Sequence, residues 1–142
     1  ALWESVSRSP AAVRRSEDVT PVSNPLLRSL SRDVRELQML LRTYARMPQD
    51  HFDDDLPAYA PDTVRALADL GVQLIGIDSA SIDPASSKRL DSHQVIRQRG
   101  LRVLENLLLD DVPEGDYELI ALPLKLTTAC ASPVRAILRE LA

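Results

Sequence analysis

The stretch PDTVRALADLGVQLIGID, residues 61–78, decides the fold class of this chain. Pro61 suits the first position of a helix, and apolar residues then recur at three- and four-residue spacing as far as Gly71, which predicts a short helix that ends at a left-handed glycine. The next six residues are mostly apolar and rich in β-branched side chains, so they predict a buried strand that ends at Asp78. A helix followed at once by a buried strand is half of a parallel α/β unit, in which functional groups gather where the strands end.

The first 38 residues carry fewer signals. Residues 1–24 are rich in Ser, Arg and Pro and keep no helical or alternating register, so we expect weak order there. From Asn24, leucines at three- and four-residue spacing predict a helix that runs to about residue 41. Residues 39–44 also fit a strand, and the sequence does not decide where helix gives way to strand.

The rest of the chain shows further local patterns. In order, we expect an acidic loop over 49–61, a helix over 92–100, strands over 101–109 and 117–126, and a closing helix over 132–141. Pro123 interrupts the second of these strands and places it at a sheet edge, because proline cannot donate a ladder hydrogen bond. Ser132 would cap the closing helix and Pro133 would take its first position.

Composition and charge exclude several classes of protein. A chain of 142 residues with 44% hydrophobic residues fits one domain with a real core. Its single cysteine, Cys130, cannot form an intramolecular disulfide, so we expect a reducing compartment, the cytoplasm. A net charge of −4 gives no electrostatic basis for binding nucleic acid. No apolar run approaches the roughly 18 residues of a membrane span, so no membrane partner is expected.

Glu105 and His93 are the candidates for metal chemistry. Glu105 stands in an otherwise apolar run, and alternation along the expected strand would put it on the face of core residues. A buried carboxylate needs a cation, a metal ion or a cluster of donors, so a pair with an arginine such as Arg102 is the structural alternative. A lone histidine is more often a surface or core residue than a ligand, but imidazole and carboxylate together suit zinc or manganese.

The remaining candidates favour structural interpretations. His51 lies beside aspartates and is expected to be a solvated loop residue, and Asp53 to Asp55 lack the spaced ligands and the glycine of a calcium loop. Cys130 has no histidine or lysine close to it in sequence, so we expect a small packed or partly exposed side chain. The sequence contains no phosphate loop, dinucleotide motif, nucleophile elbow or paired-histidine zinc helix.

Several blocks between residue 40 and the C-terminus carry a resemblance to a known family. The blocks are LRTYAR (41–46), HFD (51–53), LPA (56–58), GIDSASIDP (76–84), SK (87–88), SH (92–93), LENL (104–107), DDVPEGDYELIALPL (110–124) and ASPVRA (131–136). Together they resemble bacterial kynurenine formamidases, or arylformamidases, of the metal-dependent cyclase family.

The resemblance implies a fold, a reaction and two site residues. The fold would be a compact single α/β domain of the swivelling β/β/α, cyclase-like type, assembled as a homodimer and holding zinc or a similar divalent metal ion. The reaction would be hydrolysis of the formamide C–N bond of N-formyl-L-kynurenine to formate and L-kynurenine, a step of tryptophan catabolism. His93 and Glu105 match the two metal ligands from the family's C-terminal half.

One departure from the family concerns the N-terminal side. The family's motif His-x-Gly-Thr-His-x-Asp has no counterpart here, and residues 1–38 contain no histidine and no glycine. We therefore expect an atypical segment over 1–38 and the C-terminal part of a cyclase-like domain over 39–142, incomplete at its N-terminal side. The residue that would transfer protons has no assignment.

Two alternatives follow from that departure. The first is a catalytically inactive remnant, or interaction module, that associates with itself or with a complete homologue. The second is a gene fragment or a shifted reading frame upstream of about Leu40, which would explain why the resemblance begins abruptly.

Overall fold

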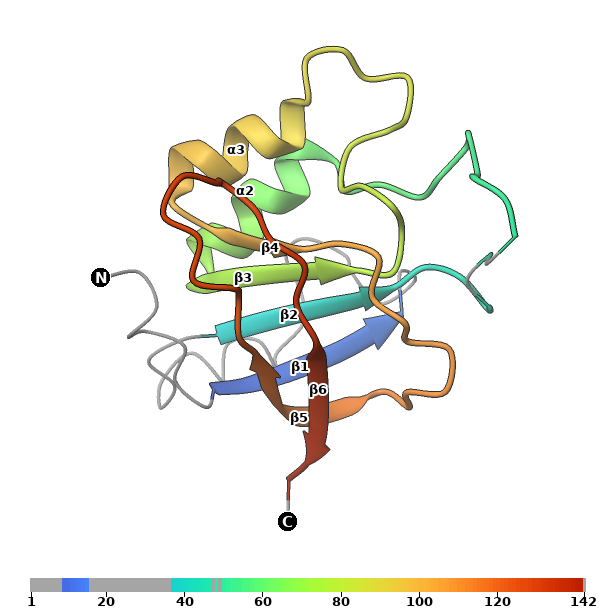
Figure 1. The fold of residues 1–142 in the computed structure, drawn as a ribbon, viewed down its shortest axis with the longest axis vertical. Coiled ribbons are helices and arrows are strands. Elements are labelled where there is room, and N and C mark those ends of the chain that lie inside the picture. Colours follow the sequence, from blue (N-terminus) through green and yellow to red (C-terminus); the bar gives the residue numbers. More distant parts are fainter. Residues whose placement is uncertain (1–8, 16–36, 47, 49, 142) are drawn as a thin grey trace.

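The computed structural model describes residues 9–15, 37–46, 48 and 50–141. Within these residues a six-stranded sheet has the order β4-β3-β2-β1-β5-β6, and two helices cover part of it (Figure 1). The elements are β1 Ser9–Arg15, β2 Leu37–Arg42, α2 Pro61–Asp69, β3 Val72–Ile77, α3 Asp91–Arg99, β4 Arg102–Leu104, β5 Gly115–Ala121 and β6 Ala136–Glu140. Strands β1 to β4 are mutually parallel, and β5 and β6 continue the sheet in antiparallel pairs. The α/β class predicted from the sequence is confirmed.

The unit that suggested this class forms as predicted. Helix α2 begins at Pro61, and the chain leaves it through Gly71, whose φ of 91° lies in the left-handed region. Strand β3 follows at once and pairs in parallel with both β2 and β4. Helix α3 ends in the same way at Gly100, with φ 66°.

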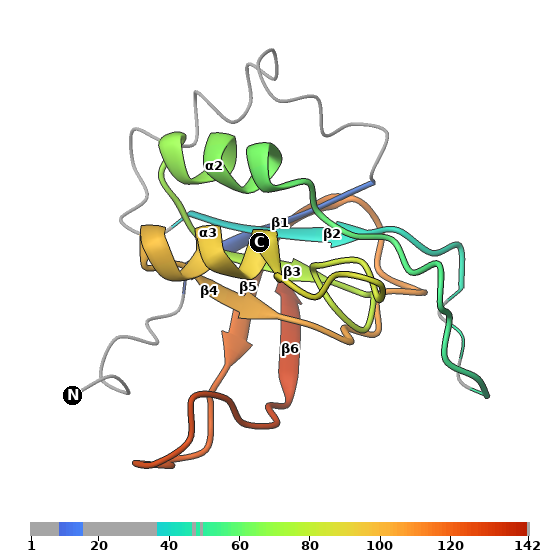
Figure 2. The same cartoon turned by 90° about the horizontal axis from the view of Figure 1, so that it is seen from above.

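The two faces of the sheet bury different clusters. Helices α2 and α3 lie side by side over one face, as Figure 2 shows, and pack on β2 and β3. The cluster under the helices contains Met39, Leu41, Tyr59, Val64, Leu67, Val72, Ile75, Ile77, Ile82, Val95 and Ile96. The opposite cluster contains Leu40, Leu74, Leu107, Leu109, Tyr117 and Leu119. Strand β3 therefore contributes to both cores, which accounts for its largely apolar sequence; Gln73 is its exposed residue.

Gly76 allows a close approach on the face away from the helices. A Cβ atom at Gly76 would lie 2.5 Å from Cδ2 of Leu40 and 2.7 Å from Cδ1 of Leu107. Both leucines are buried, so the absent side chain at this position is what lets them pack against β3 near its carboxyl end.

The Arg42 side chain connects β2 to the turn that precedes β5. Its Nη1 donates to the carbonyl oxygens of Leu109, Asp110 and Val112, at 3.4, 3.2 and 3.0 Å. One cation thus satisfies three backbone acceptors that no strand or helix pairs.

The N-terminal part of the sheet differs from expectation. Residues 9–15 form β1, between β2 and β5, although weak order or helix was expected over 1–38. Pairing on both sides stabilises a strand that its own sequence pattern does not indicate. Of the two interpretations of residues 39–44, strand is correct as far as Arg42. The helix expected from Asn24 falls on residues outside those described.

Three expectations for the C-terminal half are wrong in part. The closing helix over 132–141 is instead strand β6, because pairing with β5 outweighs a helical spacing of apolar residues. The expected edge strand ends at Ala121, before Pro123, and lies inside the sheet, with β6 at the edge. The strand expected over 101–109 is only Arg102–Leu104, because Asn106 turns the chain with a φ of 56°.

Among the described residues, no helix is both long enough and apolar enough to cross a membrane.

We predict that Gly76→Ala lowers the free energy of unfolding by about 1–3 kcal/mol, because the added methyl group overpacks Leu40 and Leu107. Gly115→Ala is the matched control: it is also a strand glycine, and its nearest neighbour to a new Cβ is Tyr117 at 3.4 Å. Urea unfolding of both variants measures the difference. Equal, small losses for the two would contradict the close packing at Gly76.

Candidate metal centre

Three side chains from three elements meet at the carboxyl end of the parallel strands. Asp83 lies in the loop that leaves β3, His93 in the first turn of α3 and Glu105 directly after β4. Nδ1 of His93 is 2.6 Å from Oδ2 of Asp83, and its Nε2 is 3.5 Å from Oε1 of Glu105. The imidazole therefore stands between two carboxylates.

Backbone hydrogen bonds fix Glu105. Its Oε1 accepts the N–H of Ile82 at 2.8 Å. The next residue, Asn106, donates its backbone N–H to the carbonyl of Ser79 at 2.9 Å. This bond continues the pairing of β3 with β4 beyond the end of β4. Glu105 is thus placed by the end of β4, not within a strand, and its side chain is 29% exposed.

Asp83 is the most enclosed of the three, at 2% exposed. Its Oδ1 accepts the backbone N–H of Ser92 at 2.8 Å, and its Oδ2 accepts that of His93 at 3.0 Å. Burial alone would raise the pKa of Asp83, but these amide hydrogen bonds and the contact with the His93 ring outweigh it and lower the pKa below its usual 3.8. Asp83 is therefore an ionised carboxylate at neutral pH.

The donor atoms of His93 and Glu105 fit part of a metal site. Two ligands at 2.0–2.2 Å from a tetrahedral ion are separated by about 3.4 Å, close to the 3.5 Å between Nε2 and Oε1. Both carboxylate oxygens of Asp83 accept hydrogen bonds from the first turn of α3, and one of them also contacts the His93 ring. Asp83 is therefore a partner of His93 and not a third ligand. Among the described residues no group of three histidine, cysteine, aspartate or glutamate side chains is placed to hold a metal ion.

The same geometry has a structural interpretation. A doubly protonated His93 would pair with both carboxylates and would need no metal ion. The arginine partner considered for Glu105 does not occur: within the described part of the chain its ion pair is with His93.

The other candidates lie elsewhere and do not join this site. His51 is exposed, and its Nδ1 lies 2.7 Å from Oδ1 of its neighbour Asp50. Asp53 accepts a hydrogen bond from the Tyr44 hydroxyl, and burial together with this bond raises the pKa of Tyr44 to about 12. The cysteine, Cys130, is exposed.

Asp78, at the end of β3, has a structural role. Its buried carboxylate accepts the N–H groups of Thr43 and Tyr44 and the Thr43 hydroxyl, at 2.6 to 3.0 Å. These bonds hold the chain where it leaves β2. The prediction that the buried strand ends at Asp78 is confirmed, and the oxygens of Asp78 are occupied by the two backbone N–H groups and the Thr43 hydroxyl.

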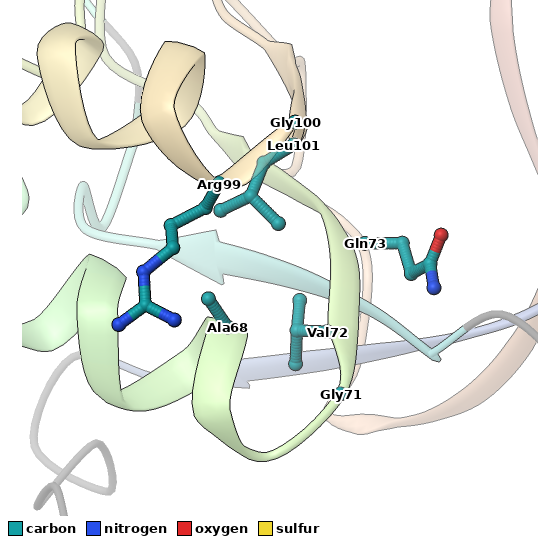
Figure 3. Close-up of a pocket in the computed structure, with 7 residues that line it drawn as sticks. All are labelled: Ala68, Gly71, Val72, Gln73, Arg99, Gly100 and Leu101. Carbon is teal, nitrogen blue, oxygen red and sulfur yellow. The ribbon is translucent and has the colours of Figure 1, made fainter.

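A shallow pocket of about 170 Å³ lies at the opposite edge of the sheet. Its lining comes from the chain around Gly71 and Gly100, where α2 and α3 end, and Arg99 extends along it (Figure 3). The Arg99 guanidinium is 2.9 Å from Asp69. The pocket is smaller than typical ligand sites, about 300–1,000 Å³, and it contains none of the candidate metal ligands.

Asp83 is the residue of this site that sequence reasoning missed. One signal points to it: the residue before α3 is Leu90, in the left-handed region with φ 53°, and it supplies no side-chain cap. A helix that starts without a local cap needs an acceptor from elsewhere, and an aspartate in the preceding loop is the natural source.

Comparison with known proteins reveals closely similar sequences. A kynurenine formamidase from Paracidovorax citrulli is 78% identical over 102 residues, which is 72% of this chain and 47% of that protein. One from Delftia acidovorans is 74% identical over 105 residues, 74% of this chain and 50% of that protein. The chain is homologous to the kynurenine formamidases. It spans about half the length of these two relatives.

A third relative extends the match towards the N-terminus. The kynurenine formamidase of Bordetella petrii is 57% identical over 132 residues, 93% of this chain and 63% of that protein. A match of 132 residues includes most of residues 1–38, whereas the blocks that carry the family resemblance begin at residue 41. No family model matches the chain.

Solved structures support the fold. A potential metal-dependent hydrolase with cyclase activity has a TM-score of 0.74 and 29% identity, over 99% of this chain and 72% of that one. A predicted metal-dependent hydrolase from Bacillus stearothermophilus has a TM-score of 0.73 and 28% identity, over 92% and 63%. This chain thus has the cyclase-like α/β fold that its resemblance to the family predicts.

We predict that Asp78→Asn lowers the free energy of unfolding by about 1–3 kcal/mol, because the amide turns a donor towards the N–H groups of Thr43 and Tyr44. The control is Asp54→Asn in the exposed acidic loop, which should change stability by less than about 0.5 kcal/mol. Thermal and urea unfolding check both. Equal stability of the two variants would contradict the anchoring role of Asp78.

Proposed function

We propose that this chain carries part of the metal centre of a kynurenine formamidase, which hydrolyses the formamide C–N bond of N-formyl-L-kynurenine. The observation that carries the proposal is the pair His93 Nε2 and Glu105 Oε1, 3.5 Å apart, in a chain that is 54–78% identical to proteins named kynurenine formamidase. The structural neighbours named metal-dependent hydrolases support a divalent metal ion, and we propose zinc.

In this proposal His93 and Glu105 hold the metal ion, and Asp83 and the Ile82 amide orient them. A bound divalent metal ion would polarise the formyl carbonyl and lower the pKa of a water molecule. In the overall reaction water adds to the formyl carbon, the C–N bond breaks, formate leaves and the aniline nitrogen takes up a proton. A catalytic zinc site usually has three protein ligands, so at least one further ligand and the proton-transfer group are proposed to come from outside the described residues.

The alternative is the inactive interaction module. The observation that favours it is the set of only two ligands among the described residues, in an arrangement that also suits a doubly protonated His93 between two carboxylates. Metal binding distinguishes the two functions, because an ion pair of this kind needs no metal ion.

Glu105→Gln tests the proposed metal site. Glutamine keeps an oxygen for the N–H of Ile82, so the fold should persist. Loss of a residue that only orients a metal ligand weakens metal affinity ~10–100-fold, so loss of the charge of a ligand itself should weaken zinc binding by at least that factor. Calorimetric titration with zinc and formate release from N-formyl-L-kynurenine are the measurements. Absence of both zinc binding and formate release in the unaltered chain would overturn the proposed function.

His51→Gln is the matched control for this test. His51 is exposed and pairs with Asp50, not with Glu105, so its loss should leave zinc affinity unchanged. If Glu105→Gln binds zinc as the unaltered chain does and loses only stability, Glu105 is a structural residue and the inactive alternative is favoured.

We also propose that the chain forms a homodimer through a C-terminal arm, defined as residues 122–141. Five apolar side chains of this arm are 49% to 59% exposed: Leu122, Leu124, Leu126, Ile137 and Leu141. The arm includes the edge strand β6, and β5 and β6 project away from the layer that carries the helices (Figure 2). Exposed apolar groups beside a sheet edge are typical of a protein interface.

The dimer is tested by replacing two of these leucines. The double substitution Leu124→Lys and Leu126→Lys should convert a dimer into a monomer in sedimentation velocity, because two charges would be buried in the interface. Leu108→Lys is the control, since Leu108 is also exposed but lies outside the arm. A monomeric unaltered chain would contradict the proposal.

A further inference from the structure

Asp83 makes two kinds of contact at once. One is with the backbone of α3, whose first turn receives no side-chain cap from the residue that precedes the helix, Leu90. Asp83 supplies that cap from the preceding loop, through the N–H groups of Ser92 and His93. The other contact is with the ring of His93, where Oδ2 lies 2.6 Å from Nδ1. The same carboxylate therefore fixes both the start of the helix and the orientation of the ring that the helix carries.

The two distances at the ring are unequal, and the shorter one identifies Nδ1 as a donor. At 2.6 Å, Nδ1 and Oδ2 are within charge-assisted hydrogen-bond length, and a carboxylate that already accepts two amides has only lone pairs to offer. Nδ1 must therefore be the donor. At 3.5 Å, Nε2 and Oε1 of Glu105 are farther apart than the roughly 2.7–2.9 Å of a hydrogen bond between an imidazolium and a carboxylate.

We propose that Asp83 is a positioning residue that keeps the His93 proton on Nδ1 and thereby leaves the lone pair of Nε2 directed towards Glu105. Only the lone pair of a neutral imidazole nitrogen binds a metal ion, so the tautomer decides whether His93 is a ligand. The consequence for metal binding rests on the proposed function. The tautomer itself does not, because the protein sets it in the absence of metal.

The tautomer is measured directly by nitrogen-15 NMR of histidine-labelled chain without metal, at mildly alkaline pH. The chain has two histidines, so two imidazole rings contribute signals, and His51→Gln identifies those of His93. The expected spectrum shows a protonated Nδ1 and an unprotonated Nε2 for His93. A proton on Nε2, alone or together with one on Nδ1, would overturn the proposal.

Asp83→Ala tests whether the carboxylate is the cause. Without its acceptor the proton should move from Nδ1 to Nε2 in a measurable fraction of molecules. Zinc affinity should fall about 10–100-fold in the same variant. Retention of the Nδ1 proton in folded Asp83→Ala would contradict the assignment.

Ser92→Ala is the control for disturbance of α3. The Ser92 hydroxyl donates to the carbonyl of Tyr59 at 2.6 Å, so its loss weakens the attachment of the helix but leaves the contacts of Asp83 intact. This variant should keep the proton on Nδ1 and the zinc affinity of the unaltered chain; a proton that moves to Nε2 here too would overturn the role of Asp83. If the unaltered chain shows the expected tautomer but binds no zinc, the proposed function fails while the role of Asp83 stands.

Discussion

Parallel pairing of β3 with β4 places the groups of the candidate metal centre. The ladder joins Ile75 to Val103 and Gly76 to Leu104, and the bond from Asn106 to Ser79 continues it past the end of β4. Glu105 is therefore held against the loop that leaves β3. Helix α3 begins where that loop ends, so His93 reaches the same edge from the other side. Parallel strands that end together bring side chains far apart in sequence to one place.

Glu105 was predicted from a pattern that holds only in part. Alternation along a strand over 101–109 would place it among core residues, but the strand ends at Leu104. The conclusion that this carboxylate needs a partner is nonetheless correct, because it lies half-buried beside the Ile82 amide and the His93 ring. The chemistry of a carboxylate in an apolar run was thus visible in the sequence, while its position in the backbone was not.

Local signals predicted local structure well. The proline and glycine that bound α2, and the apolar run of β3, are properties of adjacent residues, and both elements form as expected. Strands β1 and β6 depend on partners distant in sequence, and their own residues indicate weak order and helix instead. Asp83 escaped notice for the same reason, since its contacts with Ser92 and His93 lie nine and ten residues further along the chain.

The guanidinium of Arg42 has a consequence for how the domain unfolds. It joins the end of a parallel strand to the carbonyls of Leu109, Asp110 and Val112, immediately before the antiparallel hairpin. Separating the hairpin from the parallel strands would break these hydrogen bonds together with the ladder that joins β5 to β1. The helix-covered half of the sheet and the hairpin are therefore coupled, and local opening of one is resisted by the other, as in a single cooperative folding unit.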